Sequence, residues 1–246
     1  MMPRSVGQNC FPLPDYCIGF DRYDHKSGGI RALHVLKDEL NSRGLHAYMA
    51  YEKRYVPGDI AVYPEVIRDN PFGAKRVVRW LLNTASGLPN DGLRYAWTEG
   101  ISDDPLLTVN IIEPELWTPY TGPREGVAYW VGKGHFDPSA LPEGAIPITR
   151  DNYPTRESLA GLVRRLDYLI SFDPFTAVIT EAVVSGTPVV VLPHDLGQAV
   201  IGMESQWNLY GVAWGFDELD KARSNVHLAW QNYEDLKRVF RQRVKR

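Results

Sequence analysis

The chain has 246 residues, of which 44% are hydrophobic and 23% charged, a composition typical of a globular protein with one large domain or two small ones. Its formal net charge of −3 provides no overall attraction to nucleic acid or anionic membranes, and no apolar run has the length of a membrane-spanning helix. Cys10 and Cys17 are too few for a disulfide framework and lack the spacing of a zinc motif. We therefore expect reduced structural thiols in a cytoplasmic protein.

The first half of the chain alternates strand-like and helix-like segments, which is typical of an α/β fold with a parallel sheet. Apolar residues at helical spacing followed by Gly44 predict a helix over 30–44, and Val77, Val78, Leu81 and Leu82 predict a second helix over 70–87. Strands are predicted at 16–20, 46–51, 59–66, 93–97 and 106–112.

A segment with three prolines and two glycines, residues 113–126, reads as a linker to a second α/β unit. Strands are predicted at 128–136, 168–172 and 187–193, helices at 158–165 and 176–185, and a helix-rich end follows. We thus expect two compact Rossmann-like parallel-sheet domains facing a cleft, 1–120 and 121–202, with a helical segment, 203–246, packing back across them.

In parallel α/β sheets, ligands bind beyond the carboxyl ends of the strands. One such loop reads KSGG, residues 26–29, and places Gly28 and Gly29 at the start of a helix. Glycines allow close backbone approach, and a helix amino terminus favours phosphate. The spacing matches neither the dinucleotide fingerprint nor a P-loop, and an ordinary tight turn is the alternative.

A second loop reads VGKG, residues 131–134, at the end of the first strand after the linker. Lys133 between two glycines can reach an anion across an open cleft as a compact charge. The alternative is an exposed turn with a solvated lysine.

The third segment, SFDPFTAVITEAVVSGTPVVVLP at 171–193, is nearly apolar but contains Asp173 and Glu181. Asp173 follows a strand, and its alternative role is to cap the next helix. Glu181 has no cation three or four residues away, so we expect backbone amides or ligand hydroxyls to satisfy it, with solvent exposure as the alternative.

These three segments, in this order, resemble the retaining "group 1" glycosyltransferases of the GT-B fold. The resemblance rests on the acid, seven residues and Glu of 173–181, the Gly-Thr-Pro-Val-Val strand after them, the glycine loop of 26–29 and the basic turn of 131–134. Two departures are that Asp173 replaces the usual Glu and that the chain is short for the family.

The resemblance implies an enzyme that transfers a hexose or pentose from a nucleoside-diphosphate sugar, such as a UDP- or GDP-sugar, to a hydroxyl of a glycan, lipid-linked or other acceptor. Glu181 would accept hydrogen bonds from the ribose hydroxyls, and Asp173 would lie near the transferred sugar. The diphosphate would be held by Lys133 and the backbone of Gly28 and Gly29. Three more residues would line the phosphate end of the helix: Phe175, Thr176 and Ala177.

A cationic lysine and helix amides can stabilise a leaving diphosphate without a metal or other cofactor, and the sequence has no Asp-x-Asp motif. Arg150, Arg156 and Lys26 are unranked candidates for a second cation. His25 is a candidate catalytic base, as is His194 beside Asp195, and Glu65 is a candidate on the acceptor side. The retaining outcome follows from the resemblance alone.

The end of the chain, LKRVFRQRVKR at 236–246, gathers six cations on a predicted amphipathic helix. The simpler expectation is a solvated helix end, and the alternative is contact with DNA or with the inner face of a membrane. Two rival functions remain open: a phage-type DNA-base glycosyltransferase and a non-catalytic nucleotide-binding module.

Overall fold

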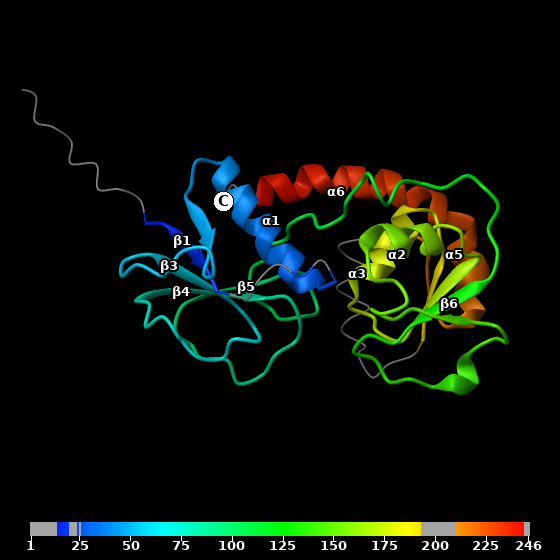
Figure 1. The fold of residues 1–246 in the computed structure, drawn as a ribbon, viewed down its shortest axis with the longest axis horizontal. Helices are drawn as coiled ribbons and strands as arrows, with labels where there is room; N and C mark the ends of the chain where they lie inside the picture. The colour runs from blue at the N-terminus through cyan, green and yellow to red at the C-terminus, as the bar shows by residue number, and fades with distance from the viewer. Residues whose placement is uncertain (1–13, 20–23, 25, 193–209, 244–246) are drawn as a thin grey trace, which may run out of the picture.

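The computed structural model describes residues 14–19, 24, 26–192 and 210–243. It contains two parallel sheets of five strands each, in two domains that lie side by side (Figure 1). The expected class, an α/β fold with two Rossmann-like domains, is confirmed.

The first domain is built on a sheet in the order β2-β1-β3-β4-β5. Its strands are β1 (Tyr16–Ile18), β2 (Ala47–Met49), β3 (Ile60–Pro64), β4 (Arg76–Leu81) and β5 (Leu93–Ala96). One long helix, α1 (Gly28–Ser42), packs its buried Ala32, Leu33 and Leu36 against this sheet. The connections between the later strands carry no helix, so this domain is a reduced version of the Rossmann arrangement.

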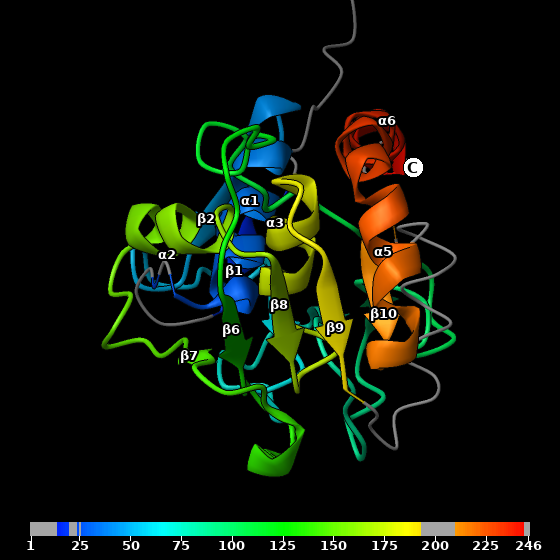
Figure 2. The same cartoon turned by 90° about the vertical axis from the view of Figure 1, so that its right-hand side faces the viewer.

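The second domain repeats the plan with the sheet order β10-β9-β8-β6-β7, seen in sequence across Figure 2. Its strands are β6 (Val127–Trp130), β7 (Ile146–Pro147), β8 (Tyr168–Ser171), β9 (Val189–Val191) and β10 (Val212–Trp214). Among its described residues the helices are α2 (Arg156–Val163), α3 (Ala177–Val184) and α5 (Leu219–Asn225), with 3-10 turns at Pro138–Ala140, Phe216–Glu218 and Val226–Leu228.

Two segments join the domains. The crossover between β5 and β6 includes the predicted linker, yet its Trp117 is fully buried and stacks near the guanidinium of Arg156. The last helix, α6 (Ala229–Arg243), packs on α3 and runs back toward the first domain (Figure 1), where Tyr233 receives a hydrogen bond from Asn110.

Three sequence predictions are wrong. The segment 70–87 forms no helix but contains strand β4, while 106–112 contributes only an isolated bridge from Leu106 to Ala96. The boundary at 202 cuts through the second sheet, because β10 pairs with β9. In β4 the apolar residues cover both faces of a central strand, which produces a run that helical spacing also fits.

Arg79 explains why a charged residue can occupy this central strand. It is fully buried and forms a two-pronged ion pair with Asp91, at 3.0 Å from Nε to Oδ1 and 2.6 Å from Nη2 to Oδ2. It also donates to the carbonyls of Ile67 and Asp69. Its polar head is thus satisfied inside the first domain alone.

We expect Asp91→Asn to destabilise the protein by about 2 kcal/mol at neutral pH, because it leaves the buried Arg79 without its counter-ion. The guanidinium of Arg79 lowers the pKa of Asp91, so this stabilisation is present at neutral pH and is lost as the pH falls through that lowered pKa. Urea unfolding from neutral to acid pH measures both effects. If the difference in free energy of unfolding between the wild type and Asp91→Asn grows as the pH falls, this prediction is wrong.

Candidate active site

The candidate site is the cleft between the domains. When the strands are numbered within each domain, both sheets have the order 2-1-3-4-5, the second sheet being read from β7 to β10. The strand order therefore reverses between β1 and β3 in the first sheet and between β6 and β8 in the second, and these are the switch points. Ligands of such sheets bind outside the carboxyl ends of the strands at these points. A cleft of about 670 Å³ lies there and includes loop residues from both domains.

The amino terminus of α1 forms one wall of the cleft. Ser27 is its N-cap, and its hydroxyl accepts a hydrogen bond from the amide of Ile30 at 3.3 Å. Gly28 and Gly29 line the cleft, as the sequence predicts, in the first turn, where amides lack intrahelical acceptors. A Cβ atom on Gly28 would lie 3.3 Å from the Cβ of Ala177, so a larger side chain here would push against the other domain.

The amino terminus of α3 forms the opposite wall. Thr176 is its N-cap and accepts from the amide of Val178 at 3.4 Å, so the alternative that Asp173 caps this helix is wrong. Phe175, Thr176 and Ala177 all line the cleft. Two helix amino termini, one from each domain, therefore meet at the same place.

Asp173 connects the loops that follow β6 and β8, at the switch point of the second sheet, through two hydrogen bonds. Its Oδ2 accepts from the backbone amide of Lys133 at 3.0 Å, and its Oδ1 accepts from the amide of Phe175 at 3.0 Å. Only 8% of Asp173 is exposed. Both oxygens are therefore engaged in shaping the loops that follow β6 and β8, and the contact with a transferred sugar remains a prediction.

The turn around Lys133 depends on its glycines. Gly132 has φ +55°, a left-handed conformation that favours glycine. A Cβ atom on Gly134 would lie 1.7 Å from the carbonyl oxygen of Phe172, which means that this turn lies directly against the backbone after β8. The side chain of Lys133 is exposed, lines the cleft, and has no ion-pair partner among the described residues.

Glu181 requires a correction. The sequence leaves backbone amides or ligand hydroxyls as its partners, but in the structure Arg31 donates to its Oε1 at 2.7 Å and Arg156 donates to its Oε2 at 3.1 Å. The carboxylate is fully buried. Neither arginine is near it in sequence, since they are 150 and 25 residues away, so local spacing gave no signal of either.

The structure also ranks the candidates for a second cation. Arg156 is occupied by Glu181 and Glu113. Arg150 and Lys26 both line the cleft, where Lys26 donates to the carbonyl of Arg150 at 3.3 Å, and Arg150 is 60% exposed and 3.8 Å from Asp24. These two side chains can still turn toward an anion.

Glu65, which follows β3 in the first domain, also lines the cleft. Its Oε2 accepts from the amide of Leu82 at 2.9 Å, and it shares a second hollow of about 530 Å³ with Lys133 and Asp173. His25, the predicted base, lies outside the described residues, as do His194 and Asp195.

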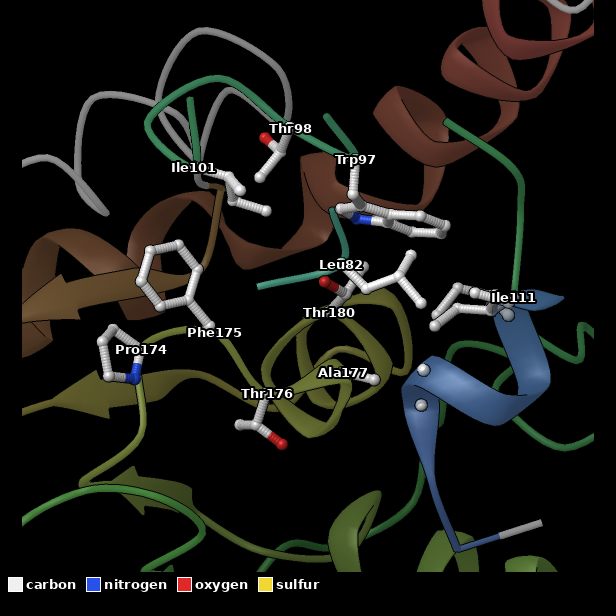
Figure 3. A pocket seen from close by; sticks show the side chains of 14 residues that line it. Leu82, Trp97, Thr98, Ile101, Ile111, Pro174, Phe175, Thr176, Ala177 and Thr180 are labelled. Carbon is white, nitrogen blue, oxygen red and sulfur yellow. The ribbon is translucent and has the colours of Figure 1, made fainter. Parts of the chain in front are cut away.

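An apolar recess of about 120 Å³ opens beside the two helix ends (Figure 3). Leu82, Trp97 and Ile101 of the first domain face Phe175 and Ala177 of the second in this view. The residues that line the recess carry no charge, and its polar side chains are the threonines Thr98, Thr176 and Thr180, so the charged groups lie in the larger part of the cleft.

Two cations of α6, Lys237 and Arg238, are already paired within the helix. Lys237 is 2.9 Å from Glu234, and Arg238 is 3.5 Å from Asp235. No helix among the described residues has the length and apolar character to cross a bilayer, and these residues contain no group of three or more potential metal ligands. Contact of α6 with DNA or a membrane remains a prediction.

No model of a known protein family matches the chain, and no curated sequence matches it. Solved structures that resemble it include the glycotransferase of kitacinnamycin, with 12% identity and a TM-score of 0.49 over 94% of this chain and 96% of that one. Another is CalG4, the calicheamicin glycosyltransferase, with 12% identity and a TM-score of 0.41 over 94% and 95%. At these values the likeness says nothing about substrate or reaction.

Proposed function

We propose that this protein is a glycosyltransferase that moves a sugar from a nucleoside-diphosphate sugar to an acceptor hydroxyl. The observation that carries the proposal is the meeting of two helix amino termini, at Gly28 and Ala177, in a cleft that also contains Lys133. Backbone amides and a cation directed at one place form a site for a phosphorylated ligand.

The same groups suit the chemistry of sugar transfer. Breaking the bond between sugar and diphosphate leaves negative charge on the diphosphate and positive character on the sugar. The first-turn amides of Gly28, Gly29 and Ala177, in helices capped by Ser27 and Thr176, would stabilise that leaving charge together with the Lys133 ammonium. Lys26 or Arg150 would supply the second cation.

The proposal has four finer parts. Transfer needs no metal, because the chain supplies the positive groups, and it should continue in EDTA. The donor is a UDP- or GDP-sugar, and Glu65 lies on the acceptor side. The retaining outcome is proposed from the sequence resemblance, and the anomeric configuration of the product, measured by NMR, tests it.

We expect Lys133→Met to weaken binding of UDP or GDP about tenfold, because it removes an exposed cation from the phosphate site without touching the core. Lys133→Arg should retain most of the affinity. Isothermal titration with both nucleotides measures this affinity. The matched control is Lys75→Met, which removes an exposed lysine outside the cleft, in the first domain.

If wild-type protein is stabilised by neither nucleotide nor by any of their sugars in a thermal-shift screen, the proposed function is wrong. Binding without any transfer or hydrolysis of the donor would instead favour a non-catalytic nucleotide-binding module.

A further inference from the structure

Four buried or half-buried charged side chains join the domains beside the cleft, and three of them, Arg31, Arg156 and Glu181, line a recess of about 70 Å³ that shares Gly28 and Ala177 with the cleft. We call this group the interdomain charge cluster: Arg31, Glu113, Arg156 and Glu181. Arg31 belongs to α1 of the first domain, Arg156 and Glu181 to α2 and α3 of the second, and Glu113 to the crossover segment between them. Two positive and two negative charges cancel, which is the condition for burying such groups.

Glu181 is the centre of the cluster. Its exposed fraction is 0%, and those of Arg31 and Arg156 are 5% and 8%. Its Oε1 accepts from Arg31 at 2.7 Å and also from Arg156, while its Oε2 accepts from Arg156 at 3.1 Å. Both carboxylate oxygens are therefore taken by guanidinium groups that come from different domains.

Glu113 completes the cluster at the crossover. Its Oε2 accepts from Nε of Arg156 at 2.8 Å and lies 3.8 Å from Nη1 of Arg31, which also donates to the carbonyl of Ile111 at 3.2 Å. Burial alone lowers the pKa of Arg156, but Glu181 and Glu113 outweigh it and the pKa is raised. The guanidinium thus stays charged, and it is bound to both the crossover segment and α3.

The spacing along the helices connects this cluster to the cleft. Arg31 comes three residues after Gly28 on α1, and Glu181 comes four residues after Ala177 on α3. Residues three or four apart lie on the same side of a helix, one turn along. The contact between Gly28 and Ala177 and the ion pair between Arg31 and Glu181 are therefore successive contacts between the same two helices.

We infer that Glu181 is a positioning residue: with Arg31 and Arg156 it fixes the separation of the amino termini of α1 and α3, and it does not itself contact the ligand. The part of this inference that concerns a ligand, a nucleoside diphosphate, rests on the proposed function. Three guanidinium hydrogen bonds already use most of the acceptor positions of the Glu181 carboxylate, and its exposed fraction is 0%, so a ribose hydroxyl could reach it only by displacing the arginines that surround it.

The distance between the domains tests the inference directly. Spin labels would be attached to cysteines introduced by Asp38→Cys in α1 and Lys221→Cys in α5, two exposed positions. The background protein carries Cys10→Ser, and it keeps Cys17, which is buried and should not react with the label. We expect one narrow distance distribution in this labelled reference protein. Glu181→Gln and Arg31→Met should broaden or shift it, and Arg31→Lys, which keeps the charge but not the forked geometry, should do so less.

The matched control is Asp91→Asn. It also removes the partner of a buried arginine, Arg79, but both residues lie in the first domain. It should lower stability and leave the distance distribution unchanged. If Asp91→Asn broadens the distribution as much as Glu181→Gln does, the effect is a general loss of stability and the inference is overturned.

Titration with UDP and GDP supplies the second readout. If either nucleotide binds the wild type, Glu181→Gln should raise its Kd about tenfold together with the change in distance. A raised Kd with an unchanged distance distribution would show that Glu181 contacts the ligand directly and would overturn the inference. So would a folded Glu181→Gln protein in which neither quantity changes. If no nucleotide binds the wild type, the proposed function fails, while the distance measurement still decides whether the cluster fixes the domains.

Discussion

Gly134→Ala is expected to destabilise the protein by about 4 kcal/mol, which corresponds to a fall in Tm of about 10 °C. The added Cβ atom would lie 1.7 Å from the carbonyl oxygen of Phe172 and 2.3 Å from its carbonyl carbon. These are backbone atoms at the end of β8, so no side-chain rotation relieves the clash and the two loops at the switch point must separate. Thermal and urea unfolding measure the effect.

Gly161→Ala is the control for this prediction. Gly161 lies inside helix α2, and a Cβ atom there would meet nothing within 4 Å. Alanine favours a helix interior over glycine, so this variant should gain about 0.5 kcal/mol. If both alanine variants have the same Tm, the close approach at Gly134 is not the constraint we describe.

Much of the fold could be predicted from the sequence because most of its elements carry local signals. The helix predicted over 30–44 is α1, and the buried strand and helix predicted from 168 to 185 are β8 and α3. The segment 70–87 misled the prediction because the central strand β4 is buried on both faces and contains an arginine. The partner that makes this arginine acceptable, Asp91, lies outside the strand, so the pairing has no local pattern.

In the candidate site, too, residues with a local sequence signal could be predicted and contacts made only by the tertiary structure could not. Loop position predicts Gly28, Gly29 and Lys133 as site residues, and the family resemblance adds Phe175, Thr176 and Ala177. The structure brings them to one cleft because both sheets place their strand ends there. The absence of a cation three or four residues from Glu181 predicts backbone amides or ligand hydroxyls as its partners, and in the structure two arginines take that place. Its partners come from the far domain and from another helix, at a contact that only the tertiary structure creates.

Asp173→Ala is expected to weaken binding of UDP or GDP about 100-fold, provided that the proposed diphosphate site is correct. The change removes the acceptor of two backbone amides, those of Lys133 and Phe175, which shape the loops on either side of the phosphate site. Leaving two such amides without partners costs about 3 kcal/mol, and the loops avoid this by rearranging, so the preformed site is lost. Isothermal titration of the folded variant measures the affinity.

Asp173→Asn separates this loop-shaping role from direct action on the sugar. An amide side chain keeps one acceptor oxygen, so it should satisfy one of the two backbone amides and weaken binding about tenfold. Asp137→Ala is the matched control, because Asp137 also accepts from an amide two residues later, that of Ser139, but does not line the cleft. If Asp173→Asn and Asp173→Ala both bind nucleotide like the wild type and lose only turnover, then Asp173 acts on the reacting sugar, as the sequence resemblance implies, and not through the loops.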